Sequence, residues 1–185
     1  NMDQFATGLV GTRSPYGVPG NSFNPDFIPG GSSSGSAVAV AKGLISFSLG
    51  TDTAGSGRVP ASFNNLLGYK PTRGIISNRG IIPACRSLDC VSVFGLQVSD
   101  ISEVLLILEE WDPQDPFSRK KKMLTSSSFS ERPRVALLED DQLDFFGDSI
   151  ARKAYDKSVS VLAESGLHPD TVDLSPFLEA AELLY

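Results

Sequence analysis

Apolar and polar residues alternate in short segments along this chain. In some segments the apolar residues have the spacing of a helix, and in others they form the short runs typical of strands. Short apolar runs bounded by Gly or Pro predict buried strands, and apolar residues at helical spacing predict helices. We expect helices at residues 34–42, 60–65, 99–111, 148–165 and 176–185. We expect strands at residues 44–49, 66–70, 91–98, 134–138 and 171–174, and a further short strand within 75–83. Because helices and strands alternate, the pattern predicts the α/β class.

Two of the predicted helices carry clear end signals. The helix at 34–42 consists mostly of small residues and ends before Gly43, so it can lie close to a sheet. The helix at 99–111 can be capped by Ser99 or Asp100, and its apolar side chains repeat at helical spacing.

The composition is that of an ordinary globular protein. Of the 185 residues, 41% are hydrophobic and 21% are charged, which is enough for a sizeable core. The net charge of −6 disfavours a nucleic-acid partner, and the one basic run, 119–122, predicts a solvated loop. No apolar run is long enough to span a bilayer, and no signal peptide is present, so we expect no membrane partner.

The two cysteines and the two ends of the sequence bear on its setting. Cys85 and Cys90 fit neither a zinc-binding spacing nor a disulfide framework, which favours a reducing, cytoplasmic location. The two ends of the sequence have the character of internal segments. Residues 1–4 do not resemble a native start, and residues 176–185 predict a helix without a stop signal. We therefore expect a fragment of a longer protein. In isolation it would be poorly soluble, because sheet edges and apolar faces would be exposed.

Two serine- and glycine-rich segments, 30–36 and 50–58, enclose one helix-sized and one strand-sized segment. They consist of Gly30-Gly31-Ser32-Ser33-Ser34-Gly35-Ser36 and Gly50-Thr51-Asp52-Thr53-Ala54-Gly55-Ser56-Gly57-Arg58. Glycine lets the backbone approach a ligand closely. Two such loops at the ends of adjacent elements could place two hydroxyls and several backbone N–H groups around one small carbonyl. That equipment is typical of an acyl-transfer site.

Other chemistries fit the sequence less well. Residues 31–35 match Gly-x-Ser-x-Gly with Ser33 as the nucleophile, but the prolines before them make a poor strand. The only histidine, His168, has no partner pattern around it. Serine, aspartate and histidine nevertheless follow one another in the chain order of an α/β-hydrolase triad, so that interpretation stays open on this order alone. No Gly-Lys-Ser/Thr follows the glycines, which disfavours a phosphate loop, and a single histidine disfavours a metal site. An arginine between the two cysteines could lower the pKa of a thiol, although packed thiols are the commoner outcome.

The segments 30–36, 50–61 and 68–74 together resemble the amidase signature family. Residues 2–8 and 87–89 also fit, so that the resemblance extends from residue 1 to about residue 110. It implies an amidase-signature fold, an α/β domain with a twisted, mixed β-sheet core covered by helices. On this basis we expect residues 1–185 to be a partial amidase domain. Its expected parts are the signature core at 1–111, a polar linker or loop at 112–133, and a further α/β part of the same domain at 134–185.

The resemblance also assigns roles to residues. It implies that Ser56 is the nucleophile and that Ser32, held by a cis peptide bond, bridges it to a base. It assigns the oxyanion hole to the backbone N–H groups of Thr53, Ala54, Gly55 and Ser56. Asp52 and Arg58 are expected to support that loop by pairing. No metal or cofactor is implied.

The lysine that serves the family as base is absent from the matching positions. Lys42 ends the small-residue helix and Lys70 belongs to a Lys-Pro-Thr element, so neither lies in the right motif. We expect the parent protein to supply the lysine from a segment upstream of residue 1. The chain as given is then expected to be inactive alone.

Within the family, residues 12–17 and 83–92 resemble allophanate hydrolases, including the form fused to a biotin-dependent urea carboxylase. This resemblance implies hydrolysis of allophanate to ammonia and carbon dioxide in urea degradation. Because allophanate is an anion, an arginine should bind its carboxylate, with Arg13 and Arg86 as candidates and Arg73 and Arg79 as others. Two alternatives stay open: another amidase-signature enzyme, such as one component of a glutamine-dependent amidotransferase, and a non-catalytic truncated amidase. Association of two copies as a homodimer is also left open.

Overall fold

The computed structural model describes residues 1–120, 134–167 and 169–183. The chain divides into two compact units, Asn1–Lys122 and Met123–Tyr185, and each is described by itself. The predictions that concern residues 121–133, His168 and the last two positions fall outside the described residues. Among the residues that are described, no helix combines the length and apolar character needed to cross a membrane.

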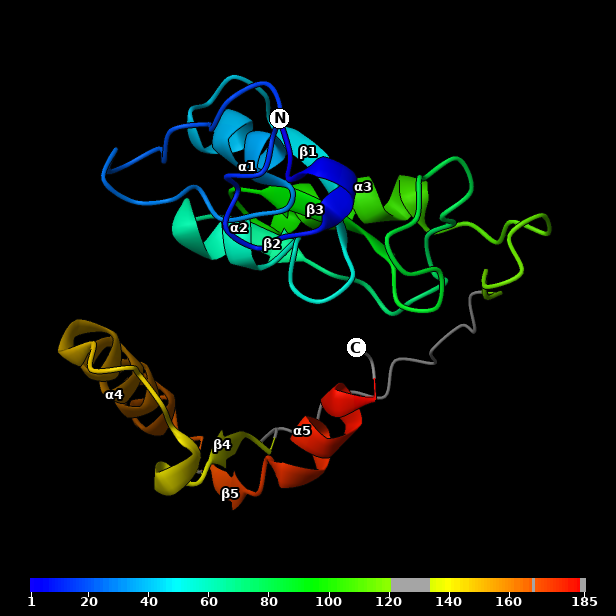
Figure 1. The fold of residues 1–185 in the computed structure, drawn as a ribbon. Helices are drawn as coiled ribbons and strands as arrows, with labels where there is room; N and C mark the ends of the chain where they lie inside the picture. Colours follow the sequence, from blue (N-terminus) through cyan, green and yellow to red (C-terminus); the bar gives the residue numbers. More distant parts are fainter. Residues whose placement is uncertain (121–133, 168, 184–185) are drawn as a thin grey trace. The chain divides into compact units, whose positions relative to one another are not determined.

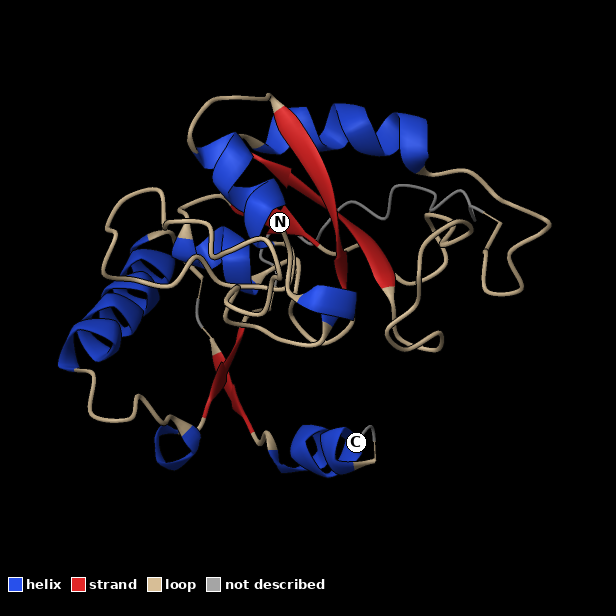
Figure 2. Cartoon of the chain, turned by 45° about the horizontal axis from the view of Figure 1, so that its top comes forward, coloured by secondary structure: helices blue, strands red, loops and turns tan. Residues whose placement is uncertain are grey.

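The first unit is built on a three-stranded antiparallel sheet, drawn as the upper group of strands in Figure 2. Its strands are β1 (Phe47–Asp52), β2 (Leu67–Tyr69) and β3 (Cys90–Gly95), and β3 lies between the other two. Every residue of β3 is buried, as expected for a central strand covered on both faces. In the register of β1 with β3, Asp52 lies opposite Cys90, so the chain leaves β1 beside the point where it enters β3.

Helices pack on both faces of this sheet and create two small cores (Figure 1). Alternate residues of β3 point to opposite faces. Phe94 packs with α1 (Ser34–Ala41) and α2 (Val59–Phe63), whereas Val93 packs with α3 (Val98–Leu108). A 3₁₀ turn, η1 (Gln4–Ala6), lies in the irregular segment before α1.

The end of α1 shows why the following strand starts late. The N–H of Gly43 donates to the carbonyl of Val40, and the N–H of Leu44 donates to that of Ala39. These bonds form a Schellman turn, which needs the positive φ of +67° that Gly43 adopts. Residues 44–46 therefore leave the turn before pairing begins, and β1 starts at Phe47 instead of residue 44.

The second unit contains a two-stranded parallel sheet of β4 (Ala136–Leu138) and β5 (Asp170–Val172). Its helical elements are η2 (Asp140–Gln142), α4 (Ser149–Glu164) and α5 (Ser175–Glu182). The carboxylate of Asp148 caps α4 by accepting the N–H groups of Ile150 and Ala151. Gly166, with φ of +79°, ends the helix, as the sequence predicts.

Most of the predicted elements are present, with ends that differ from the predicted ones by up to three residues. Two further predictions, the short strand within 75–83 and the cap at Ser99 or Asp100, are wrong. No strand forms within 75–83, because turns and bends occupy this segment and side chains from 112–115 hold it. The helix predicted from residue 99 begins at Val98, with Gln97 as its cap. The Asp100 carboxylate accepts the Gln97 N–H at 3.3 Å from inside the first turn.

Candidate active site

The loop that follows β1 carries Ser56 and is organised around one buried carboxylate. Asp52 Oδ1 accepts the N–H of Gly55 at 2.8 Å, and Oδ2 accepts the N–H of Gly57 at 3.1 Å. Arg58 donates to both oxygens, from Nε at 2.9 Å and from Nη2 at 3.0 Å. The pair expected from the sequence is therefore present. It encloses Ser56, which is 3% exposed, between two anchored neighbours.

The charge state of this pair follows from its contacts. Burial would by itself raise the pKa of the Asp52 carboxyl, but the hydrogen bond from Arg58 and those from the Gly55 and Gly57 N–H groups outweigh it. The net pKa of Asp52 lies below its ordinary value, and the hydrogen bond to Asp52 raises the pKa of Arg58. Asp52 is thus held as an anion that accepts hydrogen bonds and is unsuited to act as a general base near neutral pH.

The backbone N–H groups expected in the oxyanion hole differ in what they contact. The Gly55 N–H is committed to Asp52, so the folded loop does not leave it free for a ligand. The hydrogen bonds found among the described residues include none donated by the backbone N–H groups of Thr53, Ala54 or Ser56. Gly55 itself has a φ of +125°, a conformation that residues other than glycine rarely adopt.

The second loop carries Ser32 on a cis peptide bond between Gly31 and Ser32. Its backbone is held by distant segments: the Asp3 N–H donates to the Ser32 carbonyl at 2.9 Å, and the Gly31 N–H donates to the Leu9 carbonyl at 2.8 Å. Ser32 is fully buried, and its Oγ has no hydrogen-bond partner within the described part of the chain. A buried hydroxyl of this kind is uncommon and calls for a partner.

Ser33 joins the two loops. Its N–H donates to the Ser56 carbonyl at 3.4 Å, and its hydroxyl exchanges hydrogen bonds with the backbone of Thr51 at 3.2 and 3.3 Å. A Cβ at Gly50 would lie 2.5 Å from the Ser33 hydroxyl, so glycine is needed where the loops meet. These contacts occupy the Ser33 hydroxyl, and no strand leads into residues 31–35. Both facts argue against the Gly-x-Ser-x-Gly interpretation.

Asp89 lies within residues 87–89, which fit the family resemblance, but the sequence assigned it no role. It is buried at the entrance to β3, and its carboxylate accepts the hydroxyl of Thr53, the first residue of the Ser56 loop. The same carboxylate accepts the N–H groups of Ala84 and Cys85 at 3.1 Å. The sequence signal for it is a carboxylate close to the start of a mostly apolar strand, which needs buried donors, but the sequence does not identify those donors.

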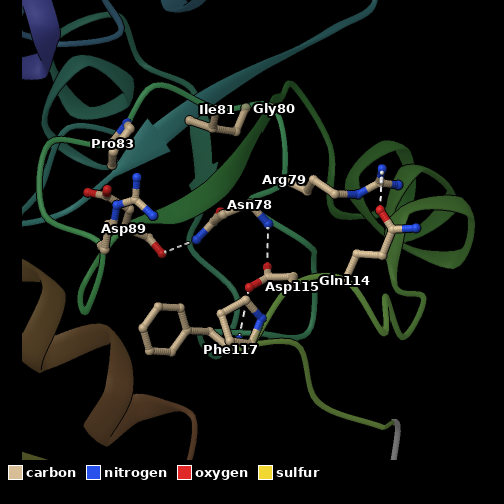
Figure 3. Close-up of a pocket in the computed structure, with 11 residues that line it drawn as sticks. Asn78, Arg79, Gly80, Ile81, Pro83, Asp89, Gln114, Asp115 and Phe117 are labelled. Carbon is tan, nitrogen blue, oxygen red and sulfur yellow. Dashed lines mark hydrogen bonds between the residues drawn. The ribbon is translucent and has the colours of Figure 1, made fainter.

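A pocket of about 290 Å³ lies next to this carboxylate, and Figure 3 shows its wall. Arg86 lines it, as do Asp89 and Arg79, but the Arg79 guanidinium is held by Asp112 and Gln114. Neither Ser32 nor Ser56 lines this pocket.

The other two candidate arginines are engaged elsewhere. The Arg13 guanidinium donates to the Thr7 carbonyl at 2.7 Å, away from the residues that line the pocket. Arg73 stacks over the Phe117 ring at 3.7 Å and donates to the Arg86 carbonyl. Among the arginines proposed from the sequence, Arg86 is therefore the one that lines the pocket without a side-chain partner of its own in the bonds found among the described residues.

Neither Lys70 nor Lys42, the two lysines considered from the sequence, completes the serine pair. Lys70 Nζ donates to the Pro71 carbonyl at 2.8 Å and lies 3.7 Å from Cys90 Sγ. Lys42 is the C-terminal cap of α1. Over the residues that the structure describes, no group of three His, Cys, Asp or Glu side chains is arranged to hold a metal ion.

A model of the family described as Amidase matches residues 1–185 of the chain. The chain belongs to the amidase family. The resemblance found in the serine-glycine segments is confirmed, and so is the α/β amidase-signature fold.

The most similar relatives of this amidase chain include urea amidolyase from Saccharomyces cerevisiae, 45% identical over 100% of the chain and 10% of that protein. The structure is similar to a serine-to-alanine variant of Kluyveromyces lactis allophanate hydrolase, with a TM-score of 0.95 and 47% identity. That match covers 100% of this chain and 30% of the other. One component of the glutamyl-tRNA(Gln) amidotransferase from Lactobacillus delbrueckii is 38% identical over 94% of the chain and 37% of that protein. The chain thus spans about a tenth of the urea amidolyase that it resembles.

Proposed function

We propose that this chain supplies the nucleophile and the oxyanion-binding loop of an enzyme that hydrolyses allophanate to ammonia and carbon dioxide. The observation that carries the proposal is the junction of two loops at Ser33. One loop holds Ser56 between anchored neighbours, and the other holds the buried hydroxyl of Ser32 without a partner among the described residues. The whole-chain similarity to urea amidolyase and allophanate hydrolase supports the choice of substrate.

In this mechanism Ser56 Oγ attacks the terminal amide carbonyl of allophanate. Its proton passes through the Ser32 hydroxyl to a base, because a serine hydroxyl is a weak nucleophile until its proton is removed. Free backbone N–H groups of Ala54 and Ser56 stabilise the negative oxygen of the tetrahedral intermediate. Collapse of that intermediate releases ammonia and leaves an acyl group on Ser56. Water, deprotonated through the same relay, then attacks the acyl group, restores the Ser56 hydroxyl and releases N-carboxycarbamate. This product breaks down to carbon dioxide and a second ammonia, which completes the stated reaction.

The base is a lysine that lies outside residues 1–185. The Ser32 hydroxyl, unpartnered within the described residues, supports this assignment, since an amine at that point would complete a Ser56–Ser32–lysine relay. Lys70 is committed to a backbone carbonyl and Lys42 to the end of α1, so neither is a candidate.

Arg86 is the better of the two sequence candidates for the substrate carboxylate. It lines the pocket beside Asp89, whereas the guanidinium of Arg13 donates to a carbonyl in its own loop. A guanidinium can bind a carboxylate through two parallel hydrogen bonds, which suits a small planar anion. In the complete enzyme, Arg86 would then select allophanate over neutral amides.

The wider setting is part of the same proposal. Residues 134–185 form a further α/β part of the amidase domain, and the complete protein acts in the cytoplasm. It is joined to, or works with, a biotin-dependent carboxylase that produces allophanate. The small share of urea amidolyase that the chain covers supports a much longer protein. Biotin belongs to the carboxylase, and the amidase reaction itself requires no cofactor.

The test uses the full-length protein, its Ser56→Ala variant and a Ser62→Ala control. Ser62 lies on α2, is exposed and is six positions from Ser56 in the same segment. Ammonia release is measured from allophanate, glutamine and simple amides. We expect release from allophanate by the wild type and by Ser62→Ala, and a loss of more than about a thousandfold in Ser56→Ala.

The two alternatives correspond to distinct outcomes. Turnover of glutamine only in the presence of partner proteins would support an amidotransferase. This alternative is retained because the chain is similar to the Lactobacillus delbrueckii amidotransferase component. No turnover of any amide by the full-length protein would support a non-catalytic amidase module.

A further inference from the structure

The buried carboxylate of Asp89 connects the Ser56 loop to the pocket wall. Asp89 is 4% exposed and directly precedes β3. Because Asp52 lies opposite Cys90 in the antiparallel register, Thr53 and Asp89 face each other where β1 and β3 end their pairing. The sheet thus places this carboxylate beside the first residue of the loop that leads to Ser56.

On the loop side, the contact is a hydrogen bond from the Thr53 hydroxyl to Asp89 Oδ1. A hydrogen bond to a carboxylate is stronger than one between neutral groups, so it restrains the Thr53 side chain and the backbone that follows. Asp52 anchors Gly55 and Gly57 further along the same loop. Two carboxylates therefore hold the loop, Asp89 at its first residue and Asp52 at the glycines on either side of Ser56.

On the pocket side, Asp89 accepts the N–H groups of Ala84 and Cys85, both at 3.1 Å. These residues immediately precede Arg86, which lines the pocket. The Asp89 carbonyl also accepts the Asn78 side chain at 2.6 Å, and Figure 3 shows this contact in the pocket wall. None of the ion pairs found among the described residues includes Asp89, so neutral donors satisfy its charge.

We propose that Asp89 is a positioning residue for the reaction: through the Thr53 hydroxyl it aims the N–H groups of Ala54 and Ser56 at the substrate carbonyl. Through the 84–85 turn, the same carboxylate fixes the wall that carries Arg86 relative to that loop. The inference rests on the proposed hydrolysis at Ser56. It assigns the side chains of Asp89 and Thr53 no contact with the substrate, because each acts through the backbone that it holds.

The test is a matched pair at Thr53 in the full-length enzyme. Thr53→Val removes the hydroxyl and keeps the side-chain shape, whereas Thr53→Ser keeps the hydroxyl. Since removing one oxyanion donor outright costs about 10²–10³ in rate, misaligning the donors should lower kcat about 10- to 100-fold in Thr53→Val. The KM of Thr53→Val should stay within about twofold of wild type, because the contacts that bind the substrate in its ground state are kept. The kcat of Thr53→Ser should stay within about threefold of wild type.

An Asp89→Ala variant, alone and combined with Thr53→Val, completes the test. If Thr53 acts through Asp89, Thr53→Val should add less than about twofold to the loss in the Asp89→Ala background. Should Asp89→Ala fail to fold, the Thr53 pair alone decides.

Wild-type kcat in Thr53→Val, or an equal loss in Thr53→Ser, overturns the inference. A wild type inactive toward allophanate refutes the proposed substrate, and the same variants are then compared on whichever amide it hydrolyses. A wild type inactive toward every amide overturns the inference as well.

Discussion

The two serine-glycine loops of this chain are held in opposite ways. The loop that carries Ser56 is anchored mainly by its own residues, since Asp52 accepts the N–H groups of Gly55 and Gly57 and pairs with Arg58. The loop that carries Ser32 is anchored from far away in the sequence. The N–H of Gly31 donates to the Leu9 carbonyl, and the Ser32 carbonyl accepts the N–H of Asp3.

Because the anchors differ, the two loops should be sensitive to different kinds of substitution. The Ser56 loop depends on two buried carboxylates, Asp52 paired with Arg58 and Asp89 at Thr53, and should respond to changes of charge. The Ser32 loop depends on close backbone approach by the first residues of the chain, where the Asp3 carboxylate also accepts the N–H groups of Gly11 and Arg13. It should therefore respond to changes of volume.

The largest effect is expected from a methyl group at Gly31. A Cβ at this position would collide with the Asp3 carboxylate and lie 2.6 Å from the Gly11 backbone nitrogen, neither of which can move freely. Gly31→Ala should therefore displace the Ser32 hydroxyl and lower ammonia release by more than about a hundredfold, since misplacement by about 1 Å can cost that much.

The control for this change is Gly20→Ala, where a Cβ would meet nothing within 4 Å. It should keep nearly wild-type activity. Full activity in Gly31→Ala would show that the Ser32 loop tolerates volume after all and would remove the proposed contrast between the loops.

A smaller effect, on stability and with a defined pH dependence, is expected from Asp52→Asn. It removes the ion pair with Arg58 and one strong acceptor for the buried N–H groups, which should lower the free energy of unfolding by about 2–3 kcal/mol at pH 7. Asp156→Asn is the matched control. Its ion pair with Arg152 lies on the exposed surface of α4, and its loss should cost about 0.5 kcal/mol or less.

The dependence of the unfolding free energy on pH, below about pH 4, tests whether Asp52 is charged in the folded protein. The folded pKa of Asp52 is lowered, so the stabilisation it provides is complete above the unfolded value of about 3.9 and is lost as pH falls through the folded pKa. The difference in unfolding free energy between wild type and Asp52→Asn should therefore shrink below about pH 4. A difference that stays constant to about pH 2 would contradict the assignment of the charged form.

The smallest expected effect is at the junction of the loops. Ser33→Ala removes the two hydrogen bonds to Thr51, leaves the N–H bond to the Ser56 carbonyl, and should cost about 1–2 kcal/mol of stability. Because the hydroxyl is not the nucleophile in this account, activity per folded molecule should fall by less than about tenfold. A complete loss of activity in stable Ser33→Ala would favour the Gly-x-Ser-x-Gly interpretation.

The same contrast explains how much the sequence could predict. Helix α1 and strand β3 were predictable because small-residue spacing, a terminal glycine and a short apolar run are local signals. The pairing of Asp52 with Arg58, six positions apart within one loop, was also within reach of the sequence. The contacts of Asp3 and Asp89 were not, because they join segments that only the folded sheet and its preceding loop bring together.

The wrong prediction within 75–83 has a related cause. Its apolar residues suggested a strand, but the Ser77 hydroxyl and the Asn78 N–H bond to Asp115, 37 to 38 positions later. Side chains distant in sequence thus satisfy groups that a strand would have paired, and the segment becomes part of the pocket wall.

The central claim is that Ser56, and no serine of the loop at 30–36, becomes acylated. The direct measurement mixes full-length enzyme with allophanate, quenches in acid within milliseconds, and locates any acyl adduct by mass spectrometry of the digested chain. We expect the adduct on Ser56 in the wild type, none in Ser56→Ala, and wild-type levels in Ser62→Ala. An adduct on Ser32 or Ser33, or one that persists in Ser56→Ala, would contradict the account.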